Sequence, residues 1–368
     1  MAALPDFDVI IAGGGLAGAC AALTLSADRR VCLLEAKHPA AGASGAAAGL
    51  INPLMGRKAN PVDAIDASLD AVHTMIHEAG AQDHLLARGV LRPAVEEKQV
   101  DFFQAAADEH PEVANWLPAA SVADRYPEVQ TAGGALFIPR GGAVDVSGFV
   151  RAMLDTARER GAIVHAAARV ADWEESTNTA RAHATFEDGS TATFSARWLL
   201  LALGWGFRGH PELEALDLRG VKGQTVRVRR PDDVAPNRLP PMSGRGYVVP
   251  EGDTLVLGSS YENEFDDLEP SDESTQYIIG KTSQMLPTLG GADVLEATAG
   301  VRVYAGSSNA PLLGPLPGRD RCWVFTGLGS KGLLTAPRLA RHLPQYLDSP
   351  STLPSRIAPA RNASDAAP

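Results

Sequence analysis

The stretch DVIIAGGGLAGACAALTLSADRRVCLLE, residues 8–35, decides the fold class. Asp8–Ala12 is apolar after its leading acid and predicts a buried strand. Leu16–Ser26 is rich in Ala and apolar on most faces, which predicts a buried helix. Arg30–Leu34 predicts a second short strand, and Glu35 ends it. The order strand, glycine turn, helix, strand and acid is typical of a dinucleotide-binding unit.

Each glycine of the turn has a physical role in such a unit. Gly13 permits the tight turn, Gly15 lets a pyrophosphate approach the backbone, and Gly18 lets the helix pack close to the sheet. The helix N-terminus offers N–H groups and a positive dipole end to the phosphates. Glu35 follows Gly13 by 22 residues, where a carboxylate accepts hydrogen bonds from ribose hydroxyls. The alternative is a glycine-rich turn without a ligand, but the complete set of flanking elements favours a dinucleotide.

The segment after Glu35 favours FAD over NAD as that dinucleotide. Residues 38–49 read HPAAGASGAAAG, a run of small side chains that is too poor in hydrophobic residues for a simple connector. Small residues let a bulky cofactor lie against the backbone. The position of the glycine motif at the extreme N-terminus also suits a flavoprotein.

Composition excludes several classes of protein. The chain has 368 residues, of which 45% are hydrophobic and 21% charged, so it can bury the core of a two-domain globular protein. A net charge of −11 argues against non-specific binding to nucleic acid. No run has the length of a signal peptide or a membrane span, so we expect no contact with a membrane. The number and spacing of the cysteines suit a reducing compartment, and we expect a cytoplasmic protein; they are Cys20, Cys32 and Cys322.

Five segments together resemble the FAD-dependent amino-acid oxidase family. This family includes D-amino-acid oxidase, glycine oxidase, sarcosine oxidase and the oxidase domain of the bifunctional tRNA wobble-uridine modification enzyme. The resemblance runs from about Asp8 to Leu347. Besides the first stretch it rests on GASG with AGL at 42–50, GGAVDVSGF at 141–149, LLLALGW at 199–205, and the C-terminal GVR, PLLG and TGLGSKGLLTAP segments at 300–337.

This resemblance implies a set of residues that contact non-covalently bound FAD. They come from the glycine turn, the end of the second strand, the small-residue loop, a strand after the first crossover helix, and the GLGSKG segment. The set is Gly13, Gly15, Leu16, Ala17, Gly18, Glu35, Ala36, Ser44, Gly45, Gly49, Leu50, Val170, Gly204, Gly329, Ser330, Lys331, Gly332 and Leu333. Lys331 stands where the tRNA-modifying relatives have Arg; the alternative for it is a solvated loop lysine.

Two further residues are candidates for contact with the substrate. Arg302 matches the family's carboxylate-binding position, and a guanidinium binds a carboxylate through two parallel hydrogen bonds. Tyr247 in GYVVP matches an active-site tyrosine of glycine oxidase. The alternatives are a structural salt bridge for Arg302 and a core aromatic for Tyr247. Tyr261 and Tyr304 are weaker candidates.

The expected fold is α/β, with a Rossmann-type FAD-binding domain and an inserted α+β substrate domain that contains an antiparallel sheet (glutathione-reductase-like, DAO type). We assign the FAD-binding domain to residues 1–75, 140–215 and 300–347, and the substrate domain to 76–139 and 216–299. Residues 348–368 are rich in Pro, Ser and Ala and predict a disordered tail. A single strand is expected at Ile163–Val170.

Three functions remain open at this point. The first is oxidation of the C–N bond of a small amino acid or N-substituted glycine, by hydride transfer to flavin N5, with O2 or another electron acceptor. The second is an oxidase acting on carboxymethylaminomethyl-uridine in tRNA, which GLGSKG favours and the net charge disfavours. The third is a non-catalytic flavin-binding redox sensor. No metal site is expected, because His73 and His77 form only an i, i+4 pair without a third ligand nearby.

Overall fold

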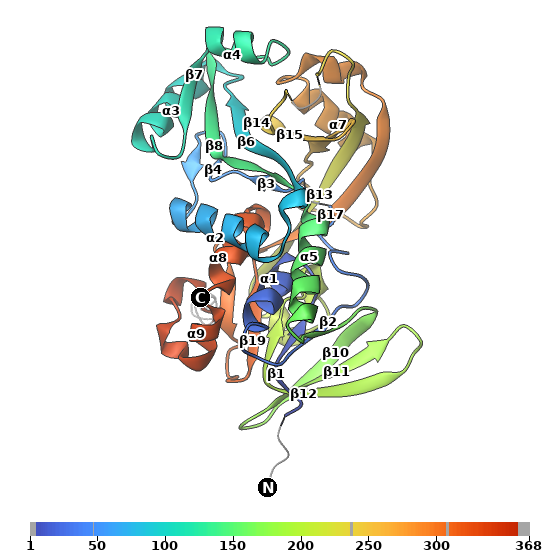
Figure 1. Cartoon of the computed structure of the whole chain (residues 1–368). Coiled ribbons are helices and arrows are strands. Elements are labelled where there is room, and N and C mark those ends of the chain that lie inside the picture. The colour runs from blue at the N-terminus through green and yellow to red at the C-terminus, as the bar shows by residue number, and fades with distance from the viewer. Residues whose placement is uncertain (1–4, 47, 236–237, 307–308, 360–368) are drawn as a thin grey trace, which may run out of the picture.

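The computed structural model describes residues 5–46, 48–235, 238–306 and 309–359. Figure 1 shows two lobes at opposite ends of an elongated molecule, each built around one sheet. The helices are α1 (Leu16–Leu25), α2 (Ile65–Glu78), α3 (Glu97–Glu109), α4 (Ala119–Arg125), α5 (Val146–Glu159), α6 (Pro211–Glu214), α7 (Asp272–Thr282), α8 (Gly332–Ala340) and α9 (Leu343–Asp348).

The first sheet has eight strands and forms the Rossmann-type lobe. Strands β1, β2, β9, β12 and β19 pair in parallel, while β10, β11 and β12 form an antiparallel meander and β18 adds to β19. The bounds are β1 (Phe7–Ala12), β2 (Val31–Leu34), β9 (Ile163–His165), β10 (Ala168–Glu175), β11 (Ala180–Phe186), β12 (Thr191–Leu201), β18 (Leu312–Pro315) and β19 (Cys322–Thr326).

The second sheet has nine strands and is mostly antiparallel. Its order is β17-β13-β16-β15-β14-β6-β8-β3, with β7 beside β8. Within the described residues of this sheet, β14 and β6 pair in parallel and the other pairs are antiparallel. The bounds are β3 (Leu50–Ile51), β6 (Leu85–Pro93), β7 (Asn115–Pro118), β8 (Gly134–Val144), β13 (Leu218–Arg229), β14 (Met242–Gly244), β15 (Gly246–Glu251), β16 (Thr254–Gly258) and β17 (Val294–Ala305). A small hairpin pairs β4 (Leu54–Met55) with β5 (Asn60–Pro61).

The core of the first lobe explains the hydrophobic run at the start of the chain. Val9 and Ile11 pack with α1, α5 and α8 on one face of the sheet, while Ile10 and Ala12 pack on the other face with β10, β11 and β12. All four side chains are fully buried. A strand covered on both faces needs apolar residues at every position rather than at alternate ones.

Two predicted elements differ in the structure. The expected single strand at 163–170 is two strands, β9 and β10, because Ala167 adopts a left-handed conformation (φ 53°) and its N–H donates to the carbonyl of Lys37. The chain from Asp348 to 359, expected to be disordered, contains two short 3-10 turns and packs on the first lobe. The reason is that two apolar side chains pack against the core: Ile357, which is 4% exposed, and the partly buried Leu353. The rest of the expected tail lies outside the described residues.

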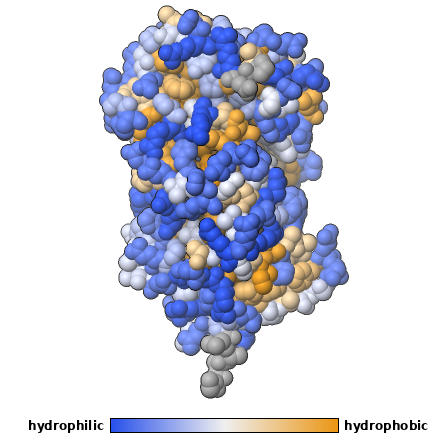
Figure 2. All heavy atoms as spheres, in the orientation of Figure 1, coloured by the Kyte–Doolittle hydropathy of each residue, from blue (hydrophilic) through white to orange (hydrophobic). Residues whose placement is uncertain are grey.

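The surface of one face is shown in Figure 2. Hydrophilic residues cover most of it, and a hydrophobic patch lies at the waist between the two lobes. Within the described residues, no helix has both the length and the apolar character needed to cross a membrane.

A buried arginine holds the hairpin β4–β5 against the second sheet. Arg92 on β6 is 2% exposed, and its guanidinium donates to the carbonyl oxygens of Leu54, Gly56 and Ser243. The ring of Phe103 lies 4.9 Å from the guanidinium carbon. Burial lowers the pKa of Arg92 to about 10, so the side chain stays charged at neutral pH.

We expect Arg92→Met to destabilise the fold by about 2–4 kcal/mol, because buried carbonyl oxygens lose their donors. The loss of stability is measured as a lower denaturant concentration at the unfolding midpoint and a lower melting temperature. The matched control is Arg88→Met on the same strand, where the side chain is exposed. Equal stability of the two variants would show that Arg92 does not hold the hairpin.

Candidate active site

The glycine turn brings two strands of the first lobe and α1 into close contact. Gly13 has a φ of 108°, and a Cβ at this position would collide with the carbonyl oxygen of Ala202 at the end of β12. A Cβ at Gly18 would collide with the carbonyl oxygen of Gly13. Both positions therefore require glycine, and the turn places the N-terminus of α1 at the carboxyl edge of the sheet.

The start of α1 offers donors for a phosphate group. Its N-cap residue is Gly15, which has no side chain to cap the helix. The Leu16 N–H donates to the hydroxyl of Ser44 at 3.0 Å, so the small-residue loop folds back over this helix end. A backbone N–H, a hydroxyl and the positive end of a helix dipole form a donor set that suits a pyrophosphate.

Glu35 lies beside the same turn. Its Oε2 accepts the Gly14 N–H at 2.6 Å, and its Oε1 accepts the Lys37 N–H at 2.8 Å. The N–H of Ala168 donates to the Glu35 carbonyl, which sets β10 and its buried Val170 next to this end of β2. The predicted ribose and adenine contacts, including Ala36, therefore lie at one edge of the first sheet.

The small-residue loop continues from Ser44 to the second sheet. Gly45 packs on the carbonyl of Ala40, and a Cβ at Gly49 would collide with the carbonyl of Val144. The Gly49 carbonyl accepts the Val144 N–H at 3.0 Å, and Leu50 pairs with β8. The loop thus spans from the N-terminus of α1 to the second lobe.

The GLGSKG segment closes over the start of α1. Gly332 lies 3.5 Å, measured from an ideal Cβ position, from the side chain of Leu16. Gly329 has a φ of 53° and lies against the ring of Tyr304, and Leu333 is buried. Ser330 and Lys331 are exposed, and Lys331 forms the N-cap of α8. In the described part of the chain the Lys331 ammonium pairs with no acid. Gly204, with a φ of 53°, follows β12 in η2 (Gly204–Phe207).

One face of β17 joins the loops of the first lobe to the second sheet. Gly300, Arg302 and Tyr304 alternate along the strand and so point the same way. A Cβ at Gly300 would lie 3.0 Å from Ala43 and Ala46 of the small-residue loop. Tyr304 forms a backbone bridge with Leu328. Arg302, between them, therefore lies on the sheet face turned toward the predicted FAD contacts.

Among the described residues, the groups that hold the Arg302 guanidinium are neutral. Its Nη1 donates to the hydroxyl of Ser259 at 3.2 Å, and its Nη2 donates to the carbonyl of Ser260 at 3.0 Å. The guanidinium carbon is 4.5 Å from the ring centre of Tyr261, and it lies over Gly223 of β13, where a Cβ would collide with it. No carboxylate among the described residues forms an ion pair with Arg302. The structural salt bridge, the alternative reading of this residue, is absent from this part of the chain.

Tyr247 belongs to the same cluster. Its hydroxyl hydrogen-bonds with Ser259, and its ring lies over Gly258 of β16. Burial raises the pKa of the Tyr247 phenol to about 12, although the charge of Arg302 and the hydrogen bond to Ser259 both lower it. The residue is partly exposed, but its hydroxyl end lies in the cluster. Tyr247 is therefore a neutral donor over the whole working pH range.

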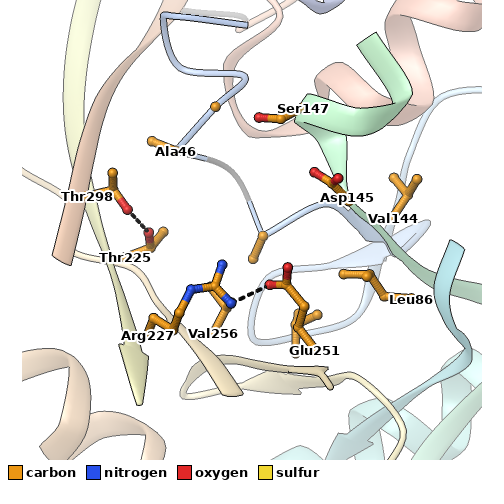
Figure 3. A pocket seen from close by; sticks show the side chains of 13 residues that line it. Ala46, Leu86, Val144, Asp145, Ser147, Thr225, Arg227, Glu251, Val256 and Thr298 are labelled. Carbon is orange, nitrogen blue, oxygen red and sulfur yellow. Dashed lines mark hydrogen bonds and ion pairs between the residues drawn. The ribbon is translucent and has the colours of Figure 1, made fainter. Parts of the chain in front are cut away.

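A cavity of about 230 Å³ lies on the same sheet face, beyond Gly300. Figure 3 shows the Arg227 guanidinium directed at Glu251, with Nη1 2.6 Å from Oε2, and Thr225 joined to Thr298. Asp145 and Ser147, at the start of α5, line the opposite wall. The small-residue loop touches the sheet at Gly300 and so lies between this cavity and Arg302.

The residues present fit FAD and give no reason to invoke a metal. The glycine cradle, the open helix end, Glu35 and the GLGSKG loop supply the donors and close backbone approach that the cofactor requires. Across the described ranges, no group of three His, Cys, Asp or Glu side chains is placed to hold a metal ion.

Sequence reasoning did not find the two serines that hold Arg302. Ser259 and Ser260 follow β16, and no pattern in the chain marks them as site residues. A usable signal was the glycine inside each neighbouring strand. Gly223 makes room for the Arg302 guanidinium, and Gly258, the last residue of β16, makes room for the Tyr247 ring. An isolated glycine in a strand indicates such a close approach.

Comparison with known proteins agrees with this geometry. A family model described as FAD dependent oxidoreductase (DAO) matches residues 8–345. The tRNA 5-methylaminomethyl-2-thiouridine biosynthesis bifunctional protein MnmC of Idiomarina loihiensis is 27% identical over 339 residues, which cover 90% of this chain and 54% of that protein. Glycine oxidase of Geobacillus kaustophilus is 25% identical over 350 residues, 90% of each chain.

A solved structure shows the same fold. The crystal structure of glycine oxidase from Geobacillus kaustophilus superposes with a TM-score of 0.79 at 23% identity, covering 93% of this chain and 94% of that one. The predicted fold class is thereby confirmed. The chain spans about half the length of the MnmC relative.

We expect Glu35→Ala to weaken FAD binding about 10- to 100-fold, because a charged acceptor of hydrogen bonds is lost. Glu35→Gln keeps one acceptor oxygen, so its affinity for FAD should lie between that of the parent chain and that of Glu35→Ala. The measurement is titration of the apoprotein with FAD, followed by quenching of flavin fluorescence. Glu174→Ala, which removes an exposed acid on β10, is the control. If both alanine variants bind FAD like the parent chain, Glu35 does not contact the cofactor.

Proposed function

Because the chain belongs to the DAO family of FAD-dependent oxidoreductases, we propose that it oxidises the C–N bond of a small amino acid or N-substituted glycine. The observation that carries this proposal is the unpaired guanidinium of Arg302. It faces the predicted FAD contacts, next to the neutral Tyr247 phenol. A partly buried cation without an acid is an unbalanced charge, and a substrate carboxylate balances it.

The residues of the cluster have separate roles in this proposal. Arg302 binds the carboxylate through two hydrogen bonds, and Tyr247 donates a third. Ser259 accepts from Arg302 and bonds to Tyr247, so it fixes the two donors relative to each other. This arrangement orients the carbon next to the amine. FAD, when bound, supplies the hydride acceptor at N5, and O2 or another acceptor takes the electrons onward.

No strong base is needed near the carboxylate clamp. A neutral amine loses hydride without prior removal of a proton from carbon, and water hydrolyses the imine that results. The side chains around Arg302 are accordingly hydroxyls and phenols, from Ser259, Tyr247, Tyr261 and Tyr304. Lys331 and the N–H groups at the start of α8 supply positive potential next to the predicted cofactor.

Action on tRNA is the second candidate, because relatives named for tRNA 5-methylaminomethyl-2-thiouridine biosynthesis match this chain. A basic track to the site would favour it, but the arginines expected to form such a track are mostly neutralised. Arg227 pairs with Glu251, Arg229 with Asp293, Arg230 with Asp253, and Arg245 with Glu96; Arg238 donates to a backbone carbonyl. Phosphate binding would have to displace these acids.

The rim next to Arg302 also disfavours a polyanion. Residues 261–273, which we call the acidic strap, read YENEFDDLEPSDE and contain seven acids and no base. Tyr261, at its start, stacks on Arg302 and hydrogen-bonds to Tyr304. Negative charge at this rim repels nucleic acid and tolerates a small zwitterion.

A non-catalytic flavin sensor, the third candidate, does not need a carboxylate clamp. The cluster around Arg302 therefore favours an enzyme. The three cysteines are buried and unpaired, which suits the reducing cytoplasm that we propose as its location.

The test is the visible spectrum of the purified protein, recorded anaerobically before and after adding glycine, sarcosine, D-alanine or D-proline. We expect a flavin spectrum that one of these amines bleaches. Arg302→Met should keep the flavin and require at least about 100-fold more of that amine, because a charge-assisted bidentate contact is lost. The control is Arg229→Met, which alters an exposed arginine on β13.

The other outcomes separate the candidates. A flavin that no small amine bleaches, but that tRNA carrying carboxymethylaminomethyl-uridine bleaches, would replace the small-substrate proposal with the second function. If neither the small amines nor the tRNA bleaches the flavin, the non-catalytic sensor is the remaining candidate.

We expect Tyr247→Phe to raise KM for the bleaching amine about fivefold, because one neutral hydrogen bond is lost. Since the pKa of Tyr247 is raised to about 12, the phenol stays protonated at neutral and mildly alkaline pH, and the variant should keep the parent pH profile there. Steady-state rates across the pH range measure both effects. Tyr277→Phe, an exposed tyrosine on α7, is the control. Loss of an alkaline limb in Tyr247→Phe would show that the phenol ionises during turnover.

A further inference from the structure

The support behind Arg302 is a buried polar network that joins the acidic strap to β13. Ser260, whose carbonyl accepts from Arg302, is 2% exposed. Its hydroxyl accepts the Gln224 N–H at 2.9 Å and donates to Glu262 Oε1 at 2.6 Å. Glu262 Oε1 also accepts from the hydroxyl of Ser274 on α7, at 3.0 Å. The carboxylate of Glu262 thus holds the serine that holds the clamp.

Gln224 anchors the same serine from the sheet. Its side chain is fully buried, and its amide donates to the Ser271 carbonyl and to the hydroxyl of Thr275 at 2.6 Å. Its Oε1 accepts the Ser271 N–H at 2.7 Å. The hydrogen bonds from Gln224 and Glu262 therefore connect Ser260 to β13 and to the start of α7. Ser260 in turn accepts a hydrogen bond from the Arg302 guanidinium.

A carboxylate at this place creates an electrostatic problem. Glu262 belongs to the support of a group that must attract a negative substrate, and its own charge opposes that attraction. Lys222 lies on β13 next to Gly223, and its side chain is only 6% exposed. Its Nζ is 3.7 Å from Glu262 Oε2 and 3.4 Å from Asp267 Oδ1. The backbones of Lys222 and Glu262 also bond reciprocally, at 3.0 Å in each direction.

We propose that Lys222 and Glu262 form a charge-balanced positioning pair for the substrate clamp. Glu262 fixes the Ser259–Ser260 segment in which Arg302 is held, and Lys222 cancels the field of Glu262 at the place where the carboxylate binds. This inference rests on the proposed function. It adds two residues that do not touch the substrate but set how strongly Arg302 attracts it.

The pair predicts different effects on carboxylate binding for its two members. Lys222→Met leaves the charge of Glu262 uncancelled, and should weaken binding of a carboxylate about tenfold, the effect of one unit charge at about 10 Å with an effective dielectric constant of about 20. Glu262→Gln keeps an acceptor for Ser260 and Ser274 but removes the charge, and should bind a carboxylate as tightly as the parent or more tightly. The double variant should recover most of the lost affinity, because the remaining partner of Lys222, Asp267, is exposed and its charge is screened by water.

The experiment titrates the FAD-loaded full chain with acetate and, separately, with acetamide, and follows the perturbation of the flavin spectrum. Acetate reports the charge effect and acetamide, its neutral analogue, reports general damage to the site. We expect the acetate constants to change as stated and the acetamide constants to stay within about twofold. With the bleaching amine, Lys222→Met should raise KM and leave kcat near the parent value. Lys98→Met, an exposed lysine with one acid partner, is the control.

Several outcomes would overturn the pair. They are parent-like acetate binding by Lys222→Met, equal losses for acetate and acetamide, or a double variant no better than Lys222→Met. If Lys222→Met does not fold with FAD bound, the Glu262→Gln variant and the double variant test the proposal instead. Weaker acetate binding in Glu262→Gln than in the parent chain would contradict the proposal that the charge of Glu262 opposes carboxylate binding. Failure of the proposed function is distinct: the parent chain would then bind acetate no better than Arg302→Met.

Discussion

The structure depends on close approach of backbone to backbone, which only glycine allows. At Gly13 and Gly18 the approach brings β12, the turn and α1 together, so the donors of the helix end lie at the edge of the first sheet. At Gly300 it brings the small-residue loop onto β17. A side chain at Gly13 or Gly18 would collide with backbone, and one at Gly300 would press on Ala43 and Ala46, so each would disturb the predicted FAD contacts. The rest of the architecture serves to hold these contacts.

A second constraint is electrostatic. Among the described residues Arg302 pairs with no acid, while Lys222 lies near two acids. Four of the five arginines considered for a basic track pair with at least one acid each, namely Arg227, Arg229, Arg230 and Arg245. Partial burial makes an unpaired guanidinium costly, and the cost is reduced by neutral acceptors and the face of an aromatic ring. These partners keep the charge in place without neutralising it. The preference for a negatively charged substrate that we propose thus depends on the absence of an acid next to Arg302 among the described residues.

Much of the fold was accessible from sequence because its signals are local. The buried strand, the glycine turn and Glu35 each act within a few residues, and the fold class, the family and FAD are confirmed. The site was accessible only in part. Arg302 and Tyr247 follow from resemblance and do come together, although their contact with substrate stays a prediction. The support of Arg302 depends on contacts between distant segments, because backbone hydrogen bonds bring Lys222 of β13 next to Glu262 in the loop that also contains Ser259. The break between β9 and β10 likewise depends on a distant contact, that of Ala167 with Lys37. Contacts of this kind between distant segments produce no pattern of hydrophobic or polar residues that can be recognised in the sequence.

The chain passes between the two sheets four times: from β2 to β3, from β8 to β9, from β13–β17 back to β18, and from β12 into β13. Neither lobe is therefore a continuous piece of polypeptide. A protease that cuts one connection leaves the lobes still joined by the others, and a fragment carrying one sheet alone cannot be made by truncation. Exchange of the whole second sheet between related proteins consequently requires two separate stretches of chain to be transplanted together, because β3, β6, β7 and β8 come from one stretch and β13 to β17 from the other.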